Sequence, residues 1–333
     1  MTATHALVVA FLDGLRRLRP PRPLRLVLGF VVGVQLAMTV PLPAAAVPVP
    51  RLLFGLGPEA DGALTSPFLR AAPVRLLTSW YTGPKDLAWM TGWRSGVVPQ
   101  AYADGYALHL IVYDGEPQGP VTTAYGPACG KAYPLSRRFL PDMQALAQTF
   151  AGDGRFYVTL FTEFQTYPCV NNQWVGAESY YRALQDQYLA AVAIFHQYAP
   201  NSRVSLGWGG WQARWDDPVN GGGRSLFPFL AAALQGSDFQ SFQAMQTDSN
   251  VADVRDMTYL LGQYGPVMLA HYRPDNGSRA VVDADVRAML TDRYLADVTA
   301  AGLFAISFMD DKLIRADPST ADFIERATAR YAE

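Results

Sequence analysis

The chain has 333 residues, of which 50% are hydrophobic and 12% aromatic, and its formal net charge at pH 7 is -2. This length allows one large core or two modest ones, as in an ordinary globular protein. Its 27 basic and 29 acidic residues are interspersed after the N-terminus, without a basic stripe between aromatic residues. This pattern argues against a nucleic-acid partner and favours a neutral ligand.

The N-terminal residues 1–46 form a segment of their own. Several arginines precede an apolar run from Leu26 to Val40, and small residues follow up to Ala46. This order is typical of a signal peptide. The run is shorter than the roughly 20 residues that span a bilayer, so we expect cleavage near Ala46. The alternative is an uncleaved membrane anchor, and both interpretations predict a secreted or extracytoplasmic protein.

The chain contains two cysteines, both in sequences typical of loops. Cys129 lies in "GPACGKAYP" and Cys169 in "QTYPCVNNQW". In an oxidising compartment, two loop cysteines predict a disulfide, and two unrelated thiols are the alternative. A metal site has little support, because there is no CxxC motif or neighbouring histidine. We expect neither a metal nor another cofactor.

Residues 47–73 are rich in Pro, Ala and Gly, which predicts a linker or capping segment. From residue 74 to 333, short apolar runs alternate with longer segments of helical periodicity, the signature of βα units around a parallel sheet. The expected strands are 74–81, 107–114, 155–163, 203–211, 238–246, 266–272 and 303–311, with an eighth near 96–102. The expected helices are 140–152, 178–199, 251–265 and 283–302. In the second helix, one apolar face comprises Tyr181, Leu184, Tyr188, Val192 and Phe195.

Seven or eight such units predict a (β/α)₈ TIM barrel, because no glycine-rich phosphate fingerprint of a doubly wound sheet follows the first strand. The active site of such a barrel lies at the C-terminal ends of its strands. The residues expected there are Trp80, Tyr81, Asp114, Glu163, Trp208, Trp211, Gln246, His271, Tyr272, Asp310 and Asp311. They include neither the spacing of a hydrolytic metal site nor a nucleophile-elbow serine.

Tryptophan, tyrosine and carboxylate side chains at one barrel end predict a carbohydrate site. Aromatic rings stack on the C–H face of a sugar, and cleavage of its acetal requires a proton donor and a second carboxylate. Glu163 is the expected donor, because it ends a hydrophobic strand in "RFYVTLFTEF". The alternative is an ion pair between Glu163 and Arg214. Trp208 and Trp211, in the glycine-rich "GWGGWQARW", are expected stacking platforms, although one of them can equally belong to the core.

The segment from "RFYVTLFTEF" to "RVSLGWGGW" resembles the family 26 glycoside hydrolases, the mannanase-type members of the retaining barrel clan. In that family a strand ends in Phe-His-Glu-Met, a helix containing tyrosine follows, and the next strand is rich in tryptophan. The resemblance covers roughly residues 74–312, and its middle third is the specific part. It implies that Glu163 is the acid/base at the end of the fourth strand.

Two departures from the family pattern affect the expected mechanism. Thr162 stands where the family has a histidine, and His271, in "MLAHYRPD", stands where the family has its nucleophilic glutamate. Imidazole does not usually trap an oxocarbenium ion, so the double-displacement mechanism of the family cannot be transferred to this chain. Three explanations remain open. Asp310 or Asp311, or else Asp114, supplies the second carboxylate; the reaction is inverting; or hydrolysis is lost and the barrel binds glycans.

Structural roles are the alternatives for these residues. Asp310 and Asp311 can cap a helix or pair with Lys312 and Arg315, and Asp114 can form an Asp-Gly turn. His271 can be an ordinary buried histidine.

The leading prediction is an exported, monomeric hydrolase of a polysaccharide, such as a β-mannan, a β-glucan or an exopolysaccharide. A catalytically silent barrel that binds an extracellular glycan is the main alternative, and a lyase or transglycosidase is a third. If Cys129 follows the third strand and Cys169 the fourth, their disulfide lies on the rim beside Glu163.

Overall fold

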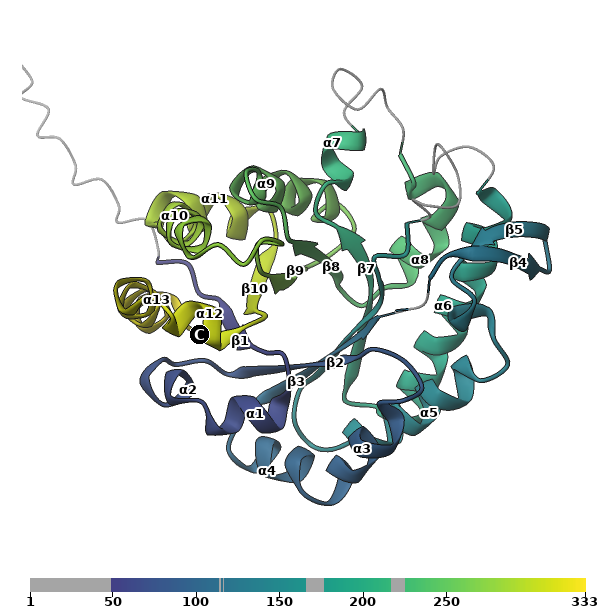
Figure 1. The fold of residues 1–333 in the computed structure, drawn as a ribbon, viewed down its shortest axis with the longest axis horizontal. Helices are drawn as coiled ribbons and strands as arrows, with labels where there is room; N and C mark the ends of the chain where they lie inside the picture. Colours follow the sequence, from purple (N-terminus) through teal and green to yellow (C-terminus); the bar gives the residue numbers. More distant parts are fainter. Residues whose placement is uncertain (1–48, 114, 116, 166–176, 217–224) are drawn as a thin grey trace, which may run out of the picture. The chain divides into compact units, whose positions relative to one another are not determined.

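A computed structural model describes residues 49–113, 115, 117–165, 177–216 and 225–333, which belong to one compact unit, Pro48–Glu333. Eight parallel strands close into a barrel in the order β1-β10-β9-β8-β7-β6-β3-β2, with helices around it (Figure 1). The barrel strands are β1 Leu53–Leu56, β2 Leu76–Tyr81, β3 Ala107–Tyr113, β6 Phe156–Thr162, β7 Ser202–Gly209, β8 Gln240–Ala244, β9 Val267–Tyr272 and β10 Leu303–Phe308. The predicted (β/α)₈ barrel is confirmed.

The remaining strands, β4 (Gly119–Thr123) and β5 (Gly126–Gly130), form an antiparallel hairpin between β3 and α5. The α-helices are α1 Ala60–Thr65, α2 Pro67–Ala71, α3 Leu87–Thr91, α4 Val97–Ala103, α5 Phe139–Phe150, α6 Glu178–Tyr198, α7 Gln212–Asp216, α8 Ala231–Gly236, α9 Asn250–Leu261, α10 Arg279–Met289, α11 Asp292–Ala300, α12 Asp311–Arg315 and α13 Pro318–Tyr331. Short 3₁₀ turns lie at Gly92–Ser95, Tyr133–Leu135 and Phe227–Leu230. Among the helices that the structure describes, none has the length and hydropathy needed to cross a bilayer.

The strands form as predicted because their apolar side chains are buried on both faces of the sheet, which is typical of a parallel barrel. One set of side chains packs against the surrounding helices, and a second, smaller set fills the barrel interior. The face of α6 predicted to be apolar is buried along its whole length, from Tyr181 to Phe195. This packing, rather than intrinsic propensity, stabilises the helix against the sheet.

Three predicted elements differ from the structure. The first barrel strand is β1, inside the segment 47–73 that was expected to be a linker or cap, so the barrel begins at Leu53. The segment 96–102, expected to be a strand, lies largely in α4. Pro99 is compatible with this helix because it occupies the first turn, where a backbone N–H has no intrahelical acceptor.

The long helix expected at 283–302 is also divided. α10 ends at Met289 and α11 begins at Asp292. Between them Thr291 is extended, and its side chain accepts a hydrogen bond from the backbone N–H of Tyr294. A threonine N-cap of this kind starts a new helix, even though the apolar residues keep a helical spacing throughout the segment.

Halfway along its axis the barrel contains a polar layer. The hydroxyl of Thr78 lies 2.6 Å from that of Ser307 and 3.2 Å from His109 Nδ1, and His109 Nε2 lies 2.9 Å from Thr159 Oγ1. Thr159 in turn donates to Ser241 Oγ at 3.1 Å. Because each of these buried groups has a partner, the layer avoids the cost of unpaired polar atoms.

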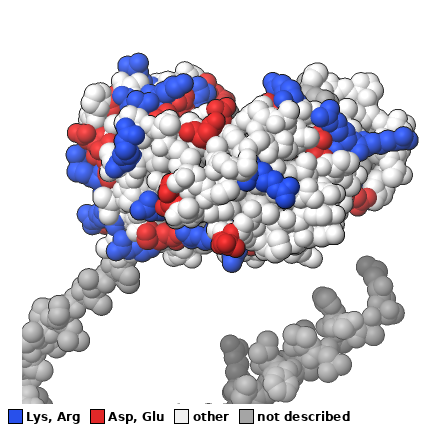
Figure 2. Space-filling view, turned by 90° about the horizontal axis from the view of Figure 1, so that it is seen from below, with Lys and Arg blue, Asp and Glu red and all other residues white. Residues whose placement is uncertain are grey.

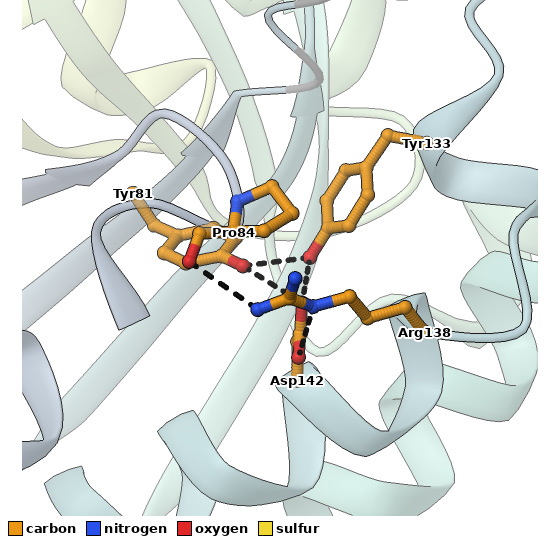
Figure 3. A network of polar contacts seen from close by, with 5 residues as sticks. All are labelled: Tyr81, Pro84, Tyr133, Arg138 and Asp142. Carbon is orange, nitrogen blue, oxygen red and sulfur yellow. Dashed lines mark hydrogen bonds and ion pairs between the residues drawn. The ribbon is translucent and has the colours of Figure 1, made fainter. Parts of the chain in front are cut away.

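A second polar cluster joins β2 to α5 behind the barrel wall (Figure 3). The carboxylate of Asp142 accepts hydrogen bonds from the hydroxyls of Tyr81, at 3.1 Å, and Tyr133, at 2.9 Å, and it forms an ion pair with Arg138 at 3.1 Å. Arg138 also donates to the carbonyl of Pro84. Burial, together with the neighbouring carboxylate, raises the pKa of both tyrosines, so both remain protonated donors.

We expect Asp142→Ala to lower the free energy of unfolding by about 3 kcal/mol, because two buried hydroxyls lose a charged acceptor. The matched control is Asp297→Ala, which removes a carboxylate that accepts from Tyr259 on the exposed surface. We expect the control to change stability by less than about 0.5 kcal/mol. Urea unfolding measures both, and equal losses in the two variants would contradict this account.

Candidate functional site

Glu163 lies at the C-terminal end of β6, the fourth strand of the barrel in chain order, as predicted. It is half-buried, and its Oε1 accepts a hydrogen bond from Gln243 Nε2 at 3.2 Å. Its backbone carbonyl accepts one from Lys131 Nζ at 2.9 Å. Two separate elements therefore hold Glu163, one by its carboxyl group and the other by its main chain.

The backbone at this strand end is strained. Phe161 has φ 62° and Glu163 has φ 65°, and these are the only two residues other than glycine with positive φ in the described part of the chain. The pairing with β3 is irregular here: Val112 pairs with Leu160, but Tyr113 pairs with Thr162, so Phe161 is skipped. A bulge of this kind redirects the side chains that follow it, and such strain is concentrated at functional sites.

Around Glu163, several buried polar atoms have no hydrogen-bond partner among the described residues. They are Trp80 Nε1, Thr162 Oγ1, Gln243 Oε1, both side-chain amide atoms of Gln165, and both ring nitrogens of His271. The polar layer below them is, by contrast, paired. Unpartnered buried atoms also occur elsewhere among the described residues, for example Ser202 Oγ and Gln240 Oε1 at the starts of β7 and β8. Those near Glu163 lie close together, so one polar ligand can supply several missing partners there.

His271, on β9, connects two sides of this cluster. A register shift between β8 and β9 pairs it with Gln243, and its ring contacts that of Trp80 on β2, with centroids 4.6 Å apart and planes nearly perpendicular. Burial lowers the pKa of His271 to about 3, with smaller contributions from Arg273 and His109. At neutral pH the imidazole is therefore uncharged, with one nitrogen as a donor and the other as an acceptor.

Two of the predicted aromatic residues lie where they can contact a ligand. Trp80 and Trp211 are both half-buried at the ends of their strands. The indole of Trp211 lies over Gly209, where an added Cβ would be 2.5 Å from the ring. A side chain at position 209 would therefore collide with this ring, so glycine is required for the packing of Trp211.

Three predicted substrate-binding residues are packed instead between the sheet and the helices. Tyr81 belongs to the cluster with Asp142, and Tyr272 donates from its hydroxyl to Asp285. Trp208 is fully buried against Phe227, with ring centroids 4.5 Å apart. The prediction was wrong for these residues because successive residues of a strand face opposite sides, so adjacent residues such as Trp80 and Tyr81 do not share a site.

The predicted second carboxylates have structural partners. Asp310 caps α12 by accepting from the backbone N–H of Lys312 at 2.9 Å, and Asp311 accepts from Ser66 Oγ at 2.5 Å and Arg315 Nε at 3.1 Å. Arg214 pairs with Asp253 at 2.9 Å, so the alternative ion pair between Arg214 and Glu163 is wrong.

The other predicted residues are placed as follows. Gln246 is half-buried after β8, and its main chain is bound by the side chain of Asn250. Cys129 lies in β5 and is not a free thiol. Asp114 and Cys169 lie outside the described residues. Within the described ranges no group of three or more His, Cys, Asp or Glu is arranged to hold a metal ion.

Sequence reasoning missed three polar residues of this barrel end: Lys131, Gln243 and Asp216. Asp216 ends α7, the short helix after β7. Burial raises its pKa, although hydrogen bonds from Gln212 and Ser225 oppose the effect. Its place after a tryptophan-rich strand end was a usable signal. Lys131 and Gln243 gave no such signal, because their contacts with Glu163 are made only in the folded chain.

Comparisons with known proteins show the fold. No family model matches the chain, and no curated protein matches it. Among solved structures, the chain is similar to a GH5-4 broad-specificity endoglucanase from Clostridium longisporum, with a TM-score of 0.51 and 9% identity over 84% of this chain and 96% of that one. It is also similar to the xylanase XynB from Paenibacillus barcinonensis, with a TM-score of 0.50 and 12% identity over 78% and 83%.

A third similar structure is an exo-β-1,4-mannosidase from Opitutaceae bacterium strain TAV5, with a TM-score of 0.50 and 12% identity. That match covers 84% of this chain but only 59% of the mannosidase. At such identities the likeness establishes a shared barrel fold.

We expect the stability of the protein to fall with pH below about 6.5. His109 and His271 are fully buried, and burial lowers the pKa of each from 6.5 to about 3. The unfolded chain therefore binds protons that the folded chain does not, and the loss grows from pH 6.5 down to about pH 3. Between pH 7.5 and pH 5 it amounts to about 2 kcal/mol for each histidine.

Urea unfolding at the two pH values measures this loss in the wild type and in His271→Phe. The variant should lose about half of the pH dependence that the two histidines cause. An identical pH dependence in both proteins would show that His271 is not held neutral by the fold.

Proposed function

We propose that this protein is a glycoside hydrolase that cleaves a polysaccharide, with Glu163 as the general acid. The observation that carries the proposal is the setting of Glu163: a half-buried carboxyl group at the end of the fourth barrel strand, on strained backbone, with one oxygen held by Gln243. An acid that protonates a glycosidic oxygen needs a fixed direction of this kind.

The neighbouring groups suit a neutral, hydroxyl-rich ligand. The indole N–H of Trp80, the amide oxygen of Gln243 and the uncharged imidazole of His271 offer donors and acceptors without net charge. Trp80 and Trp211 add ring surfaces that can stack on a sugar. On the molecular face in Figure 2, basic and acidic side chains are mixed and much of the surface is uncharged, which also suits a neutral polymer.

The substrate class follows from this chemistry together with the fold. We propose a β-mannan, a β-glucan or an exopolysaccharide. The resemblance of the segment around Glu163 to family 26 supports the first of these, and the similar solved structures include a mannosidase, an endoglucanase and a xylanase. We further propose an exported protein that acts as a monomer and contains a disulfide between Cys129 and Cys169.

The proposed reaction is inverting. A neutral imidazole at the end of β9 cannot form the glycosyl ester that a carboxylate forms in a retaining enzyme. Glu163 then protonates the leaving oxygen while a second carboxylate removes a proton from the attacking water. The two carboxyl groups of an inverting enzyme are roughly 6.5–9.5 Å apart, which leaves room for that water. We propose Asp310 or Asp216 as that base: Asp310 caps α12 and Asp216 is bound by Gln212, whereas Asp311 is held by both Ser66 and the Arg315 ion pair.

A second candidate function is binding without cleavage. It is favoured by His271, because the loss of a strand-end carboxylate is what a hydrolase that became a glycan-binding protein would show. The same cluster of donors, acceptors and indole rings would hold the sugar. The presence or absence of catalytic turnover separates the two functions.

We expect the mature chain to release reducing sugars from at least one member of a panel of mannans, glucans, xylans and bacterial exopolysaccharides. Glu163→Gln should reduce the rate at least about 10²-fold, because amide replaces the proton donor. The matched control, Glu178→Gln, changes an exposed glutamate of α6 and should keep the wild-type rate. In an active protein, Asp216→Asn and Asp310→Asn then locate the base.

If no glycan is cleaved, yet one is bound equally well by the wild type and Glu163→Gln, the protein is a binding protein. If the wild type cleaves a glycan and Glu163→Gln cleaves it at the same rate, the acid is a different residue.

We expect Cys129 and Cys169 to be recovered as one linked peptide pair after proteolysis of the protein under non-reducing conditions. The expected stabilisation, measured by urea unfolding with and without reductant, is about 4 kcal/mol for a loop of this length. Recovery of both cysteines as alkylated thiols from protein prepared in an oxidising compartment would contradict the pairing.

A further inference from the structure

The β4–β5 hairpin brings one lysine to the end of β6. Lys131 immediately follows β5, and the hairpin lies beside α6 (Figure 1). The backbone N–H of Lys131 donates to the hydroxyl of Tyr180 in α6 at 3.2 Å. The preceding residue, Gly130, approaches the same tyrosine so closely that an added Cβ would lie 2.2 Å from its ring. This packing fixes the main chain from which the lysine side chain extends.

The side chain of Lys131 is directed inward. The residue is only 6% exposed, and its Nζ donates to the carbonyl oxygen of Glu163 at 2.9 Å. The same nitrogen lies 4.7 Å from the ring centroid of Tyr113, which contacts Trp80 edge-on. Burying an ammonium group is costly, and this hydrogen bond and this cation–π contact contribute to offsetting the loss of hydration.

The carbonyl that Lys131 binds belongs to the strained residue. A glutamate with φ 65° persists only where surrounding contacts hold the backbone in that conformation. Lys131 binds the main chain of Glu163, whereas Gln243 binds its carboxyl group. One contact is made to the main chain of Glu163 and the other to its carboxyl group, so together they restrict where the carboxyl group points.

We propose that Lys131 is a positioning residue, which keeps Glu163 in its left-handed backbone conformation and thereby aims the acid at the glycosidic oxygen. The proposal rests on the proposed function only in the identity of the acid. It assigns the hairpin a role in the reaction, as the element that delivers this lysine from outside the barrel.

The test compares Lys131→Met, which keeps the length of the side chain but removes the donor, with Lys131→Arg, which keeps a donor. The control is Lys85→Met, which changes an exposed lysine in the loop after β2. For each variant we would determine a crystal structure and a melting temperature. The values of kcat and KM are measured on the glycan that the wild type cleaves best.

In Lys131→Met we expect Glu163 to move to negative φ and to lose its bond to Gln243. We expect kcat to fall about 10²-fold, the effect of a misplacement near 1 Å, while KM changes less than about twofold. Lys131→Arg should recover most of the lost kcat, and Lys85→Met should match the wild type.

The proposal is overturned if Glu163 keeps its conformation in Lys131→Met and kcat matches that of Lys85→Met. It is also overturned if kcat falls only in proportion to a loss of folded protein, as the melting temperatures would reveal. If the wild type cleaves no glycan, the proposed function fails, whereas the crystal structures still decide whether Lys131 holds Glu163.

Discussion

The alternation of side chains along each strand of a closed barrel is the constraint on which this site depends. Every second residue faces the axis, so the interior is built in layers contributed by different strands. The middle layer pairs its hydroxyls and His109 with one another. The layer above it, with Trp80, Gln243 and His271, leaves polar atoms unpaired. These unpaired groups therefore lie together, above the paired layer.

The same constraint explains how far the sequence could predict the structure. Most strands were predicted correctly because they are long apolar runs buried on both faces, and Glu163 was found because it is a carboxylate at the end of such a run. β1 was missed because only four residues, all buried, lie in a segment rich in proline and glycine. A local pattern cannot mark a strand so short when its stability comes from pairing with β10 and β2.

The surroundings of Glu163 could not be predicted for a different reason. Lys131 and Gln243 reach it from positions 32 and 80 residues away in the chain, and neither lies in a motif. The bulge at Phe161 that turns the glutamate depends on the register between β6 and β3. Sequence patterns report the period of a strand, whereas register and bulges are set by packing across the barrel.

The neutral imidazole at the end of β9 limits the mechanisms open to the proposed hydrolase. In a retaining glycosidase one carboxyl group protonates the leaving oxygen, and the other is the nucleophile that forms the covalent intermediate. Here the end of β9 offers a neutral imidazole, so the proposed reaction needs its second carboxylate from another element of this barrel end, such as Asp216 in α7 or Asp310 before α12. Loops tolerate sequence change more readily than strands. The proposed hydrolysis would therefore be gained or lost by a change at one rim residue, while the indole, amide and imidazole groups beside Glu163 remain in place.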